Sequence, residues 1–198
     1  GEDFGFSQSD QPGYLSEDGV ASIFGQVMQI PSIIPVYDIM GNYAPVSRIS
    51  GLQANNNPVA ELHRQADFTR KTLGLQGNVF AQVSLMKGLT LKTLFGINYL
   101  DFHGRSPNEA NPESYIARQY DQLTESYNES RQWNWTNTLN YTKSFRDHAI
   151  DFLIGTEAID NKYQAFSATR INFFTTDPNY FVLSAGQGQQ TNGGTASE

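Results

Sequence analysis

The fold is decided by residues 72–99, which read TLGLQGNVFAQVSLMKGLTLKTLFGINY. From Leu73 to Leu85 every second side chain is apolar or glycine, and the side chains between them are mostly polar or small. A similar alternation starts again at Leu89 and runs to Tyr99, after a break at 86–88 that suits a tight turn. Because successive side chains of a β-strand point to opposite faces of a sheet, this period of two predicts a hairpin of long amphipathic strands.

A second hairpin is expected further along the chain, with a short turn at 146–147. Its apolar residues recur with period two between polar neighbours, and they are Trp133, Trp135, Leu139, Tyr141, Ile150, Phe152 and Ile154. A polar stretch separates it from the first hairpin. We therefore expect four barrel strands in two hairpins within 67–162, joined by a long loop at 103–130.

The two flanks are expected to be loop regions. Residues 1–66 contain one helical signal at about 16–30, where Ser16 suits a cap and apolar residues recur at helical spacing from Val20 to Met28. Pro31 ends that pattern, and we expect the helix to bury its apolar stripe within the loop. Residues 163–198 show no clear pattern and are expected to form a second loop region.

Composition narrows the class of protein. Only 17% of residues are charged, against roughly 25% in an average soluble domain. The net charge of −7 argues against a nucleic-acid partner, because such sites neutralise phosphates with cations. The absence of cysteine excludes a disulfide framework and a thiolate metal site. The chain begins with Gly1 and ends in a polar, glycine-rich stretch, so we expect it to be a fragment of a longer protein.

The lengths of the connections indicate how such a sheet is used. They run short at 86–88, long at 103–130, short at 146–147 and long after 162. Transmembrane barrels have short turns on one side of the membrane and long loops outside. No run of about 18 apolar residues is present, which excludes a transmembrane helix but leaves membrane crossing by a closed barrel.

The fold class expected from these features is all-β. It is an antiparallel meander of long amphipathic strands, part of a large transmembrane β-barrel, with long extracellular loops and one short loop helix. In this arrangement the residues expected to face lipid are Leu75, Val79, Leu91, Phe95 and Ile97, and those expected to face the interior are Gln76, Asn78 and Asn98. The alternative is a soluble extracellular glycan-binding or adhesin-like β-sandwich, whose apolar face would meet a second sheet; a glycoside hydrolase fragment is a third, weaker alternative.

The sequence resembles the SusC/RagA family of TonB-dependent outer-membrane transporters over most of residues 31–160. The segments that carry the resemblance are Pro35-Val36-Tyr37, Gly41-Asn42-Tyr43, Asn57-Pro58-Val59-Ala60, Gly77-Asn78, Leu89-Thr90-Leu91-Lys92, Trp133 to Phe145, His148 and Leu153 to Glu157. Their order and spacing together are more specific than any one of them alone.

The resemblance implies a bacterial outer-membrane protein that takes part in nutrient uptake. Barrels of this kind have about 22 strands. The family imports oligosaccharides or peptides together with a SusD-type surface lipoprotein that covers the barrel, and it draws energy from the TonB complex. Nothing here matches the plug domain or the TonB box, so contact with TonB is expected through parts of the parent chain that this sequence does not contain.

No enzyme chemistry is indicated. We expect no catalytic residue, no cofactor and no metal, because the three histidines lie far apart and no nucleophile or phosphate-binding motif is present. The candidates for contact with cargo or a partner are three tyrosines of the expected long loop, Tyr115, Tyr120 and Tyr127, whose rings could stack on sugars or pack on a protein.

Overall fold

The computed structural model describes residues 1–12, 22–45, 56–113 and 117–197, and places six strands in one antiparallel sheet. The strands are β1 (Glu2–Pro12), β2 (Thr69–Met86), β3 (Leu89–Asn108), β4 (Gln122–Phe145), β5 (His148–Ile171) and β6 (Thr191–Ser197). Each strand pairs with the next one along the chain, so the sheet is a simple meander. The expected all-β antiparallel meander is therefore confirmed.

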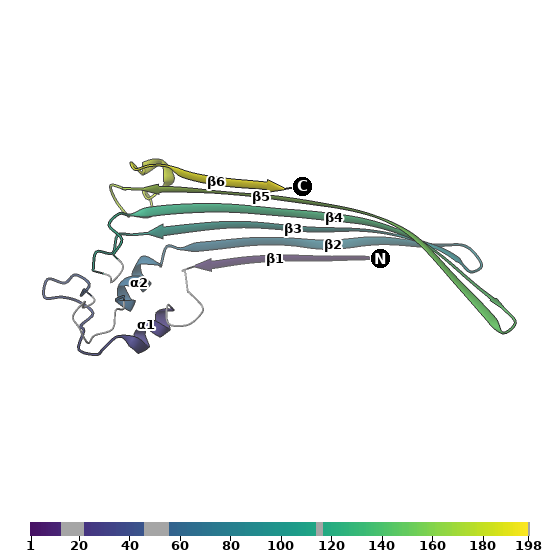
Figure 1. Cartoon of the computed structure of the whole chain (residues 1–198), viewed down its shortest axis with the longest axis horizontal. Helices are drawn as coiled ribbons and strands as arrows, with labels where there is room; N and C mark the ends of the chain where they lie inside the picture. The colour runs from purple at the N-terminus through teal and green to yellow at the C-terminus, as the bar shows by residue number, and fades with distance from the viewer. Residues whose placement is uncertain (13–21, 46–55, 114–116, 198) are drawn as a thin grey trace.

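The connections gather by length at the two ends of the sheet (Figure 1). Tight turns join β2 to β3 and β4 to β5 at one end, which we call the turn end. The connections from β1 to β2, β3 to β4 and β5 to β6 lie at the opposite end, which we call the loop end. The predicted alternation of short and long connections is confirmed, and the described parts of the long connections all lie at the loop end.

Both tight turns require backbone in the left-handed region. Gly88 has a φ of +84°, and a Cβ at this position would lie 2.2 Å from the carbonyl oxygen of Thr142. Glycine meets both demands, because it lacks the side chain that would clash. In the β4–β5 turn Arg146 takes a φ of 48°, which is uncommon outside glycine, asparagine and aspartate.

In the described part of the chain, three short helices lie at the loop end: α1 (Ile23–Gln29), α2 (Pro58–Arg64) and the 3-10 turn η2 (Leu183–Ala185). The Ser22 hydroxyl accepts a hydrogen bond from Gly25 and begins α1, whereas Ser16 lies outside the described residues. Asn57 caps α2 by accepting from Val59 and Ala60, with Pro58 in the first turn. Among the described residues, no helix has the length and apolarity needed to cross a membrane.

Several predicted boundaries are wrong. Residues 1–66 include strand β1 and helix α2; α1 lies within the expected 16–30, of which residues 16–21 are outside the described part of the chain. The loop expected at 103–130 is only 109–121, because β3 and β4 continue past the apolar part of the sheet. The region expected to be loop at 163–198 holds the end of β5 and all of β6. Six strands are present instead of four, since pairing with a neighbour extends strands that the apolar pattern does not mark.

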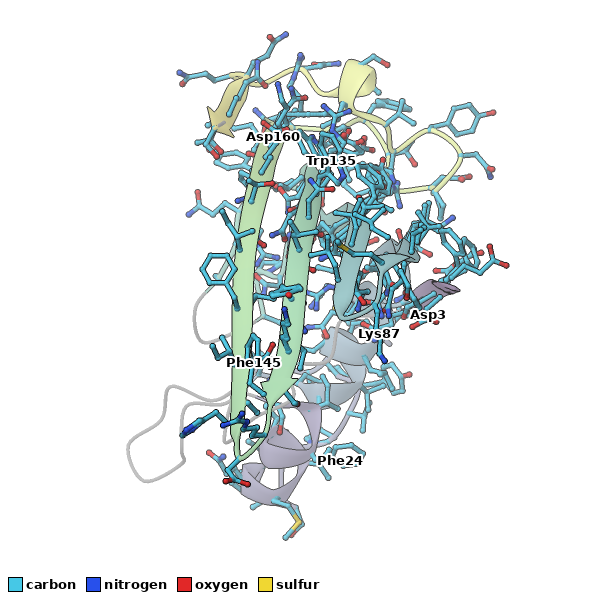
Figure 2. All side chains as sticks on the ribbon, turned by 90° about the vertical axis from the view of Figure 1, so that its right-hand side faces the viewer. Asp3, Phe24, Lys87, Trp135, Phe145 and Asp160 are labelled. Carbon is cyan, nitrogen blue, oxygen red and sulfur yellow. The ribbon has the colours of Figure 1, made fainter. Side chains whose placement is uncertain are left out.

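The strands are paired in a nearly continuous register. One irregularity, between Ser84 and Met86, interrupts the pairing of β2 with β3 near the turn. Side chains stand on both faces of the sheet, and most of them are exposed (Figure 2). The few buried apolar residues, Ala44, Ala60, Leu123 and Phe181, lie at or near the loop end. The described chain is therefore a long sheet that carries a small packed region at one end.

Candidate functional site

One face of the sheet is apolar over the part nearest the turn end. Val79 pairs with Phe95, which in turn pairs with Trp135, so side chains of one parity fall into rows across the strands. We call this surface the apolar belt, and its residues are Phe4, Phe6, Leu75, Val79, Val83, Leu89, Leu91, Phe95, Ile97, Tyr99, Trp133, Trp135, Leu139, Ile150, Phe152 and Ile154. All five residues expected to face lipid lie in it. Most belt side chains are exposed on the isolated sheet.

Two polar groups on the face of the apolar belt have close partners, one in Trp135 and one in Lys143. The indole N–H of Trp135 donates to Thr93 Oγ1 at 3.0 Å. The rings of Phe95 and Trp133 stack with centroids 6.2 Å apart. At the turn end, the ammonium group of Lys143 lies 4.6 Å from the ring centroid of Phe145. A surface that excludes water needs such pairing, because an unsatisfied donor there costs several kcal/mol.

The same face changes character toward the loop end. Beyond Tyr99, which pairs with Arg131, ionisable side chains appear at this parity on every long strand, among uncharged ones such as Leu123, Gln164 and Phe166. We call this second surface the charged band, and it contains Asp10, Lys71, Asp101, His103, Arg105, Glu125, Glu129, Arg131, Asp160, Lys162 and Arg170. Two ion pairs in it are long, with Lys71 to Asp10 and Arg105 to Glu125 both at 3.9 Å. The boundary between the belt and the band shifts by about two residues from each long strand to the next, from Lys71 on β2 to Asp101, Arg131 and Asp160.

The opposite face is polar and rich in amides. Gln76, Asn78 and Asn98 lie there, opposite in parity to the apolar belt. A shallow hollow of about 390 Å³ opens on this face, lined mainly by Asp3, Gln76, Asn78, Asn98, Gln132 and Asn134. Gly96 makes room for it, because a Cβ at this position would come 2.3 Å from Asn134 Oδ1. Amide groups both donate and accept hydrogen bonds, so this face suits water and polar solutes.

The three candidate tyrosines have different settings. Tyr120 lies in the 109–121 loop, is exposed and lines an open hollow beside Phe174. Tyr127 is not in a loop: it belongs to β4, where its hydroxyl donates to Glu129 at 2.9 Å and its ring packs on Phe166. Tyr115 lies outside the described residues. The prediction of a loop position for Tyr127 is wrong, because β4 begins earlier than its apolar pattern.

A tight turn at the loop end holds two apolar side chains in solvent. The Asp38 carboxylate accepts from the N–H groups of Met40 at 2.8 Å and Asn42 at 2.9 Å, and Gly41 has a φ of +84°. Loss of hydration would raise the pKa of Asp38, but these hydrogen bonds hold that pKa below its ordinary value. Ile39 is fully exposed and Met40 is 81% exposed. We call this feature the apolar tip.

The base of the apolar tip is packed against α2. Asn57 donates through Nδ2 to the carbonyl of Val36 at 2.8 Å, and Tyr37 stacks on Tyr43 with centroids 5.5 Å apart. Arg64 of α2 forms a close ion pair with Glu113 of the 109–121 loop. These contacts join two of the long connections into one unit, which supports the tip.

Helix α1 does not bury its apolar stripe as predicted. Phe24, Val27 and Met28 share one side at helical spacing, and all three are exposed. Together with the apolar tip they make the N-terminal part of the loop end unusually apolar on its outside. Exposed apolar clusters held by ordered backbone are typical of contact surfaces for a partner.

The connection from β5 to β6 forms a second ordered unit. Phe181 is buried and meets Phe173 edge to face, with centroids 4.4 Å apart. Arg105 of β3 donates to the carbonyl of Phe181 at 2.7 Å, and Arg170 of β5 donates to that of Gly186. An open pocket of about 530 Å³ lies on this loop, and its main lining residues are Phe174, Thr175, Asp177, Asn179, Tyr180 and Val182. We call it the loop pocket.

Sequence reasoning missed both the apolar tip and the loop pocket. The tip has a readable signal, because Asp38, Gly41 and Asn42 are typical turn residues around two apolar ones. The loop pocket has none, since it depends on Phe181 packing beneath a loop of irregular sequence. Within the described residues, no group of three or more His, Asp or Glu side chains is placed to hold a metal ion.

Comparison with known proteins places the fold. No protein-family model matches this sequence, and no curated protein matches it significantly. The structure of the RagAB peptide transporter is similar over 98% of this chain, with a TM-score of 0.70 and 22% identity. Structures of the RagAB peptide importer in the open-open and closed-closed states also match over 98% of this chain, each with a TM-score of 0.61, at 21% and 20% identity. This chain covers only 22–23% of those chains, and at such identity the likeness concerns the fold.

Proposed function

We propose that this chain is an internal segment of the barrel of a TonB-dependent transporter of the SusC/RagA type in a bacterial outer membrane. The transporter imports oligosaccharides or peptides, and its likeness to structures of a peptide transporter favours peptides. Its proposed partners are a SusD-type surface lipoprotein and the TonB complex, the latter through parts of the protein outside this sequence. The proposal assigns no catalytic role to any residue.

The observation that carries this proposal is the limited height of the apolar belt. From Leu89 to Tyr99 the belt follows β3 for about 34 Å at about 3.4 Å per residue. At a strand tilt of about 40° it would span about 26 Å, close to the apolar band of about 25 Å in outer-membrane barrels. The first ionisable residue beyond the belt is Asp101 on β3, Arg131 opposite Tyr99 on β4 and Asp160 opposite Trp133 on β5, so the boundary shifts by two residues from each strand to the next. Because barrel strands are tilted by about 35–45°, a flat membrane boundary would cross neighbouring strands at such shifted positions.

The charged band also weighs against the soluble β-sandwich. A second sheet packed on this face would have to cover Asp101, Arg131 and their neighbours as well as the belt, since all of them share one side of continuous strands. Burying ionisable groups without close partners is costly. In a barrel the belt meets lipid while the charged band stays in water, which removes that cost for the band; Glu2, opposite Val79 on the same face, is an exception within the belt.

This proposal assigns each end of the sheet to one side of the membrane. Short turns face the periplasm and long loops face the outside in barrels of this type. The apolar tip, the loop pocket and Tyr120 would accordingly lie at the cell surface, where cargo and the lipoprotein approach. Binding residues concentrate on loops held by a rigid scaffold. We assign the lipoprotein contact to the apolar tip, because two exposed aliphatic side chains on a fixed turn suit a protein pocket.

Cysteine scanning in the full-length transporter tests the membrane assignment. Single cysteines at Leu75, Val79, Leu91, Phe95 and Ile97 should react with a probe dissolved in the lipid phase. Cysteines at Gln76, Asn78 and Asn98 provide matched controls at similar depth and opposite parity. Equal labelling of both sets would contradict the barrel proposal.

Uptake in whole cells tests the transport assignment. Cells that carry the full-length transporter and its lipoprotein should accumulate a labelled oligopeptide, and removal of TonB should stop accumulation while leaving surface binding. Oligosaccharide uptake is measured in parallel, because the proposal allows either cargo class. Accumulation that does not depend on the transporter would contradict the proposal.

A further inference from the structure

The loop pocket is a preformed feature of the β5–β6 connection. The backbone N–H groups of Tyr180 and Phe181 both donate to the carbonyl of Asp177, at 2.9 and 2.8 Å, which closes a turn. Phe181 then anchors that turn, since its ring is buried and its carbonyl accepts from Arg105 of β3. The pocket walls are thus held by strands on which the barrel itself depends, so little ordering is needed when a ligand enters.

The lining combines aromatic rings with one carboxylate. Phe174 is 95% exposed and Tyr180 is 66% exposed, although both lie on an ordered loop. Asp177 uses Oδ1 to accept from the backbone and side-chain nitrogens of Asn179, at 2.9 and 3.0 Å. Within the described residues, Oδ2 accepts no hydrogen bond. No lining side chain is cationic, so the negative charge of the pocket is not balanced from within.

This combination selects for a cation on an apolar stem. A lysine or arginine side chain can lay its methylene groups on an aromatic ring while its charged head reaches a carboxylate. Aromatic faces attract such a cation directly, and a charge-assisted hydrogen bond to Asp177 Oδ2 adds to that attraction. A neutral sugar would satisfy the rings but would leave the charge of Asp177 without a counterpart.

We propose that the loop pocket binds a lysine or arginine side chain of the peptide cargo and gives the transporter a preference for basic peptides. The proposal rests on the function proposed above, and it names the class of peptide. Asp177 is the residue that sets the preference, with Phe174 and Tyr180 as the walls that hold the stem. The Asp177→Asn variant removes the charge but keeps an oxygen that can accept from Asn179, so the loop should retain its shape.

The test uses the purified full-length transporter and two short peptides of glycine and serine that differ at one central residue, lysine or glutamine. Dissociation constants are measured for the wild type, Asp177→Asn, Asp177→Glu and Asp67→Asn. Asp67 is a matched control, because it is an exposed carboxylate near the loop end and does not line the pocket. We expect the wild type to bind the lysine peptide about tenfold more tightly, which corresponds to about 1.4 kcal/mol.

The expected pattern is specific to the pocket. Asp177→Asn should reduce the preference to near unity by weakening only the lysine peptide, Asp177→Glu should keep part of it, and Asp67→Asn should keep all of it. Equal binding of both peptides by the wild type, or an equal loss in Asp67→Asn, overturns the pocket assignment while peptide transport stands. A transporter that neither binds nor imports either peptide contradicts the cargo class and the pocket together.

Association with the surface lipoprotein is measured in the same variants. The proposal expects this association to be unchanged in Asp177→Asn. If association is lost and the peptide preference does not change, the lysine or arginine that binds in the pocket belongs to the lipoprotein. That result would overturn binding of cargo at this pocket.

Discussion

Replacing Val79 with arginine places a charge near the middle of the apolar belt. On β3 the belt runs from Leu89 to Tyr99, and Val79 pairs with Phe95, one residue from its midpoint. Val79 is 47% exposed on the sheet, so its side chain points outward instead of filling a core. Arginine at the midplane of an outer-membrane barrel costs roughly 2–4 kcal/mol, and near the interfaces about 0–1. We therefore expect the full cost for Val79→Arg, which lowers the ratio of folded to unfolded barrel by about 30-fold to 1,000-fold.

The measurement is equilibrium unfolding of the full-length barrel in phospholipid vesicles. Asn78→Arg is the matched control, because it changes the neighbouring residue at the same depth on the opposite face, and we expect a loss below about 1 kcal/mol there. Leu73→Arg lies at the edge of the belt opposite Asp101 and should fall within the interface range. Equal losses for Val79→Arg and Asn78→Arg would refute the assignment of faces, and a Leu73→Arg loss as large as that of Val79→Arg would refute the boundary.

Four further outcomes are expected. Gly88→Ala should lower the free energy of unfolding of the barrel by about 1–2 kcal/mol or more, and Gly41→Ala should lower it less. Both glycines have a left-handed backbone, but only at Gly88 would an added Cβ lie 2.2 Å from a backbone atom. The 198-residue chain expressed alone should aggregate without detergent, since β1 and β6 leave parts of both sheet edges unpaired; a monodisperse, cooperatively unfolding monomer in buffer would contradict this. Shortening the 109–121 loop in the full transporter should lower lipoprotein association or uptake while the amount of barrel at the cell surface stays normal. A change of the 86–88 turn should lower neither. The reverse result would mean that the turn end is the functional end. Replacing both Ile39 and Met40 with serine should weaken co-purification of the lipoprotein at least tenfold, and unchanged recovery would exclude the apolar tip as its contact.

The sequence predicts the sheet wherever one strand face is apolar. The four central strands, their order and both tight turns follow from alternation between Leu73 and Ile154 and from turn residues such as Gly88. The outward extensions of β3 and β4 were missed, because their belt-side face changes from apolar to ionisable beyond Tyr99 and no longer contrasts with the amide-rich face. Strand identity there depends on hydrogen bonds to neighbours, which a single strand's sequence does not record.

The edge strands and the loops are harder to predict from the sequence than the central strands. β6 reads TNGGTAS and carries no apolar residue except Ala196, while β1 has only Phe4 and Phe6 to mark its face. Helix α2 could have been read from Asn57 and Pro58, an N-cap followed by proline at the first helical position. The loop pocket could not, because Phe181 becomes an anchor only when β3 brings Arg105 to its carbonyl and Phe173 packs on its ring.

The nearly unbroken register has a consequence for how such a chain can change during evolution. Inserting one residue into β3 would exchange its faces from that point onward, sending Phe95 and Ile97 inward and Asn98 outward, and it would misalign the rows with both neighbours. Changes in strand length are therefore accepted only in pairs of residues matched on adjacent strands, or where a bulge such as the one near Ser84 absorbs the extra residue. The loops at the loop end are not subject to this constraint on length. Descendants of one ancestral barrel can thus diverge in what they capture at the surface by gaining and losing loop residues, while their strands keep the same lengths.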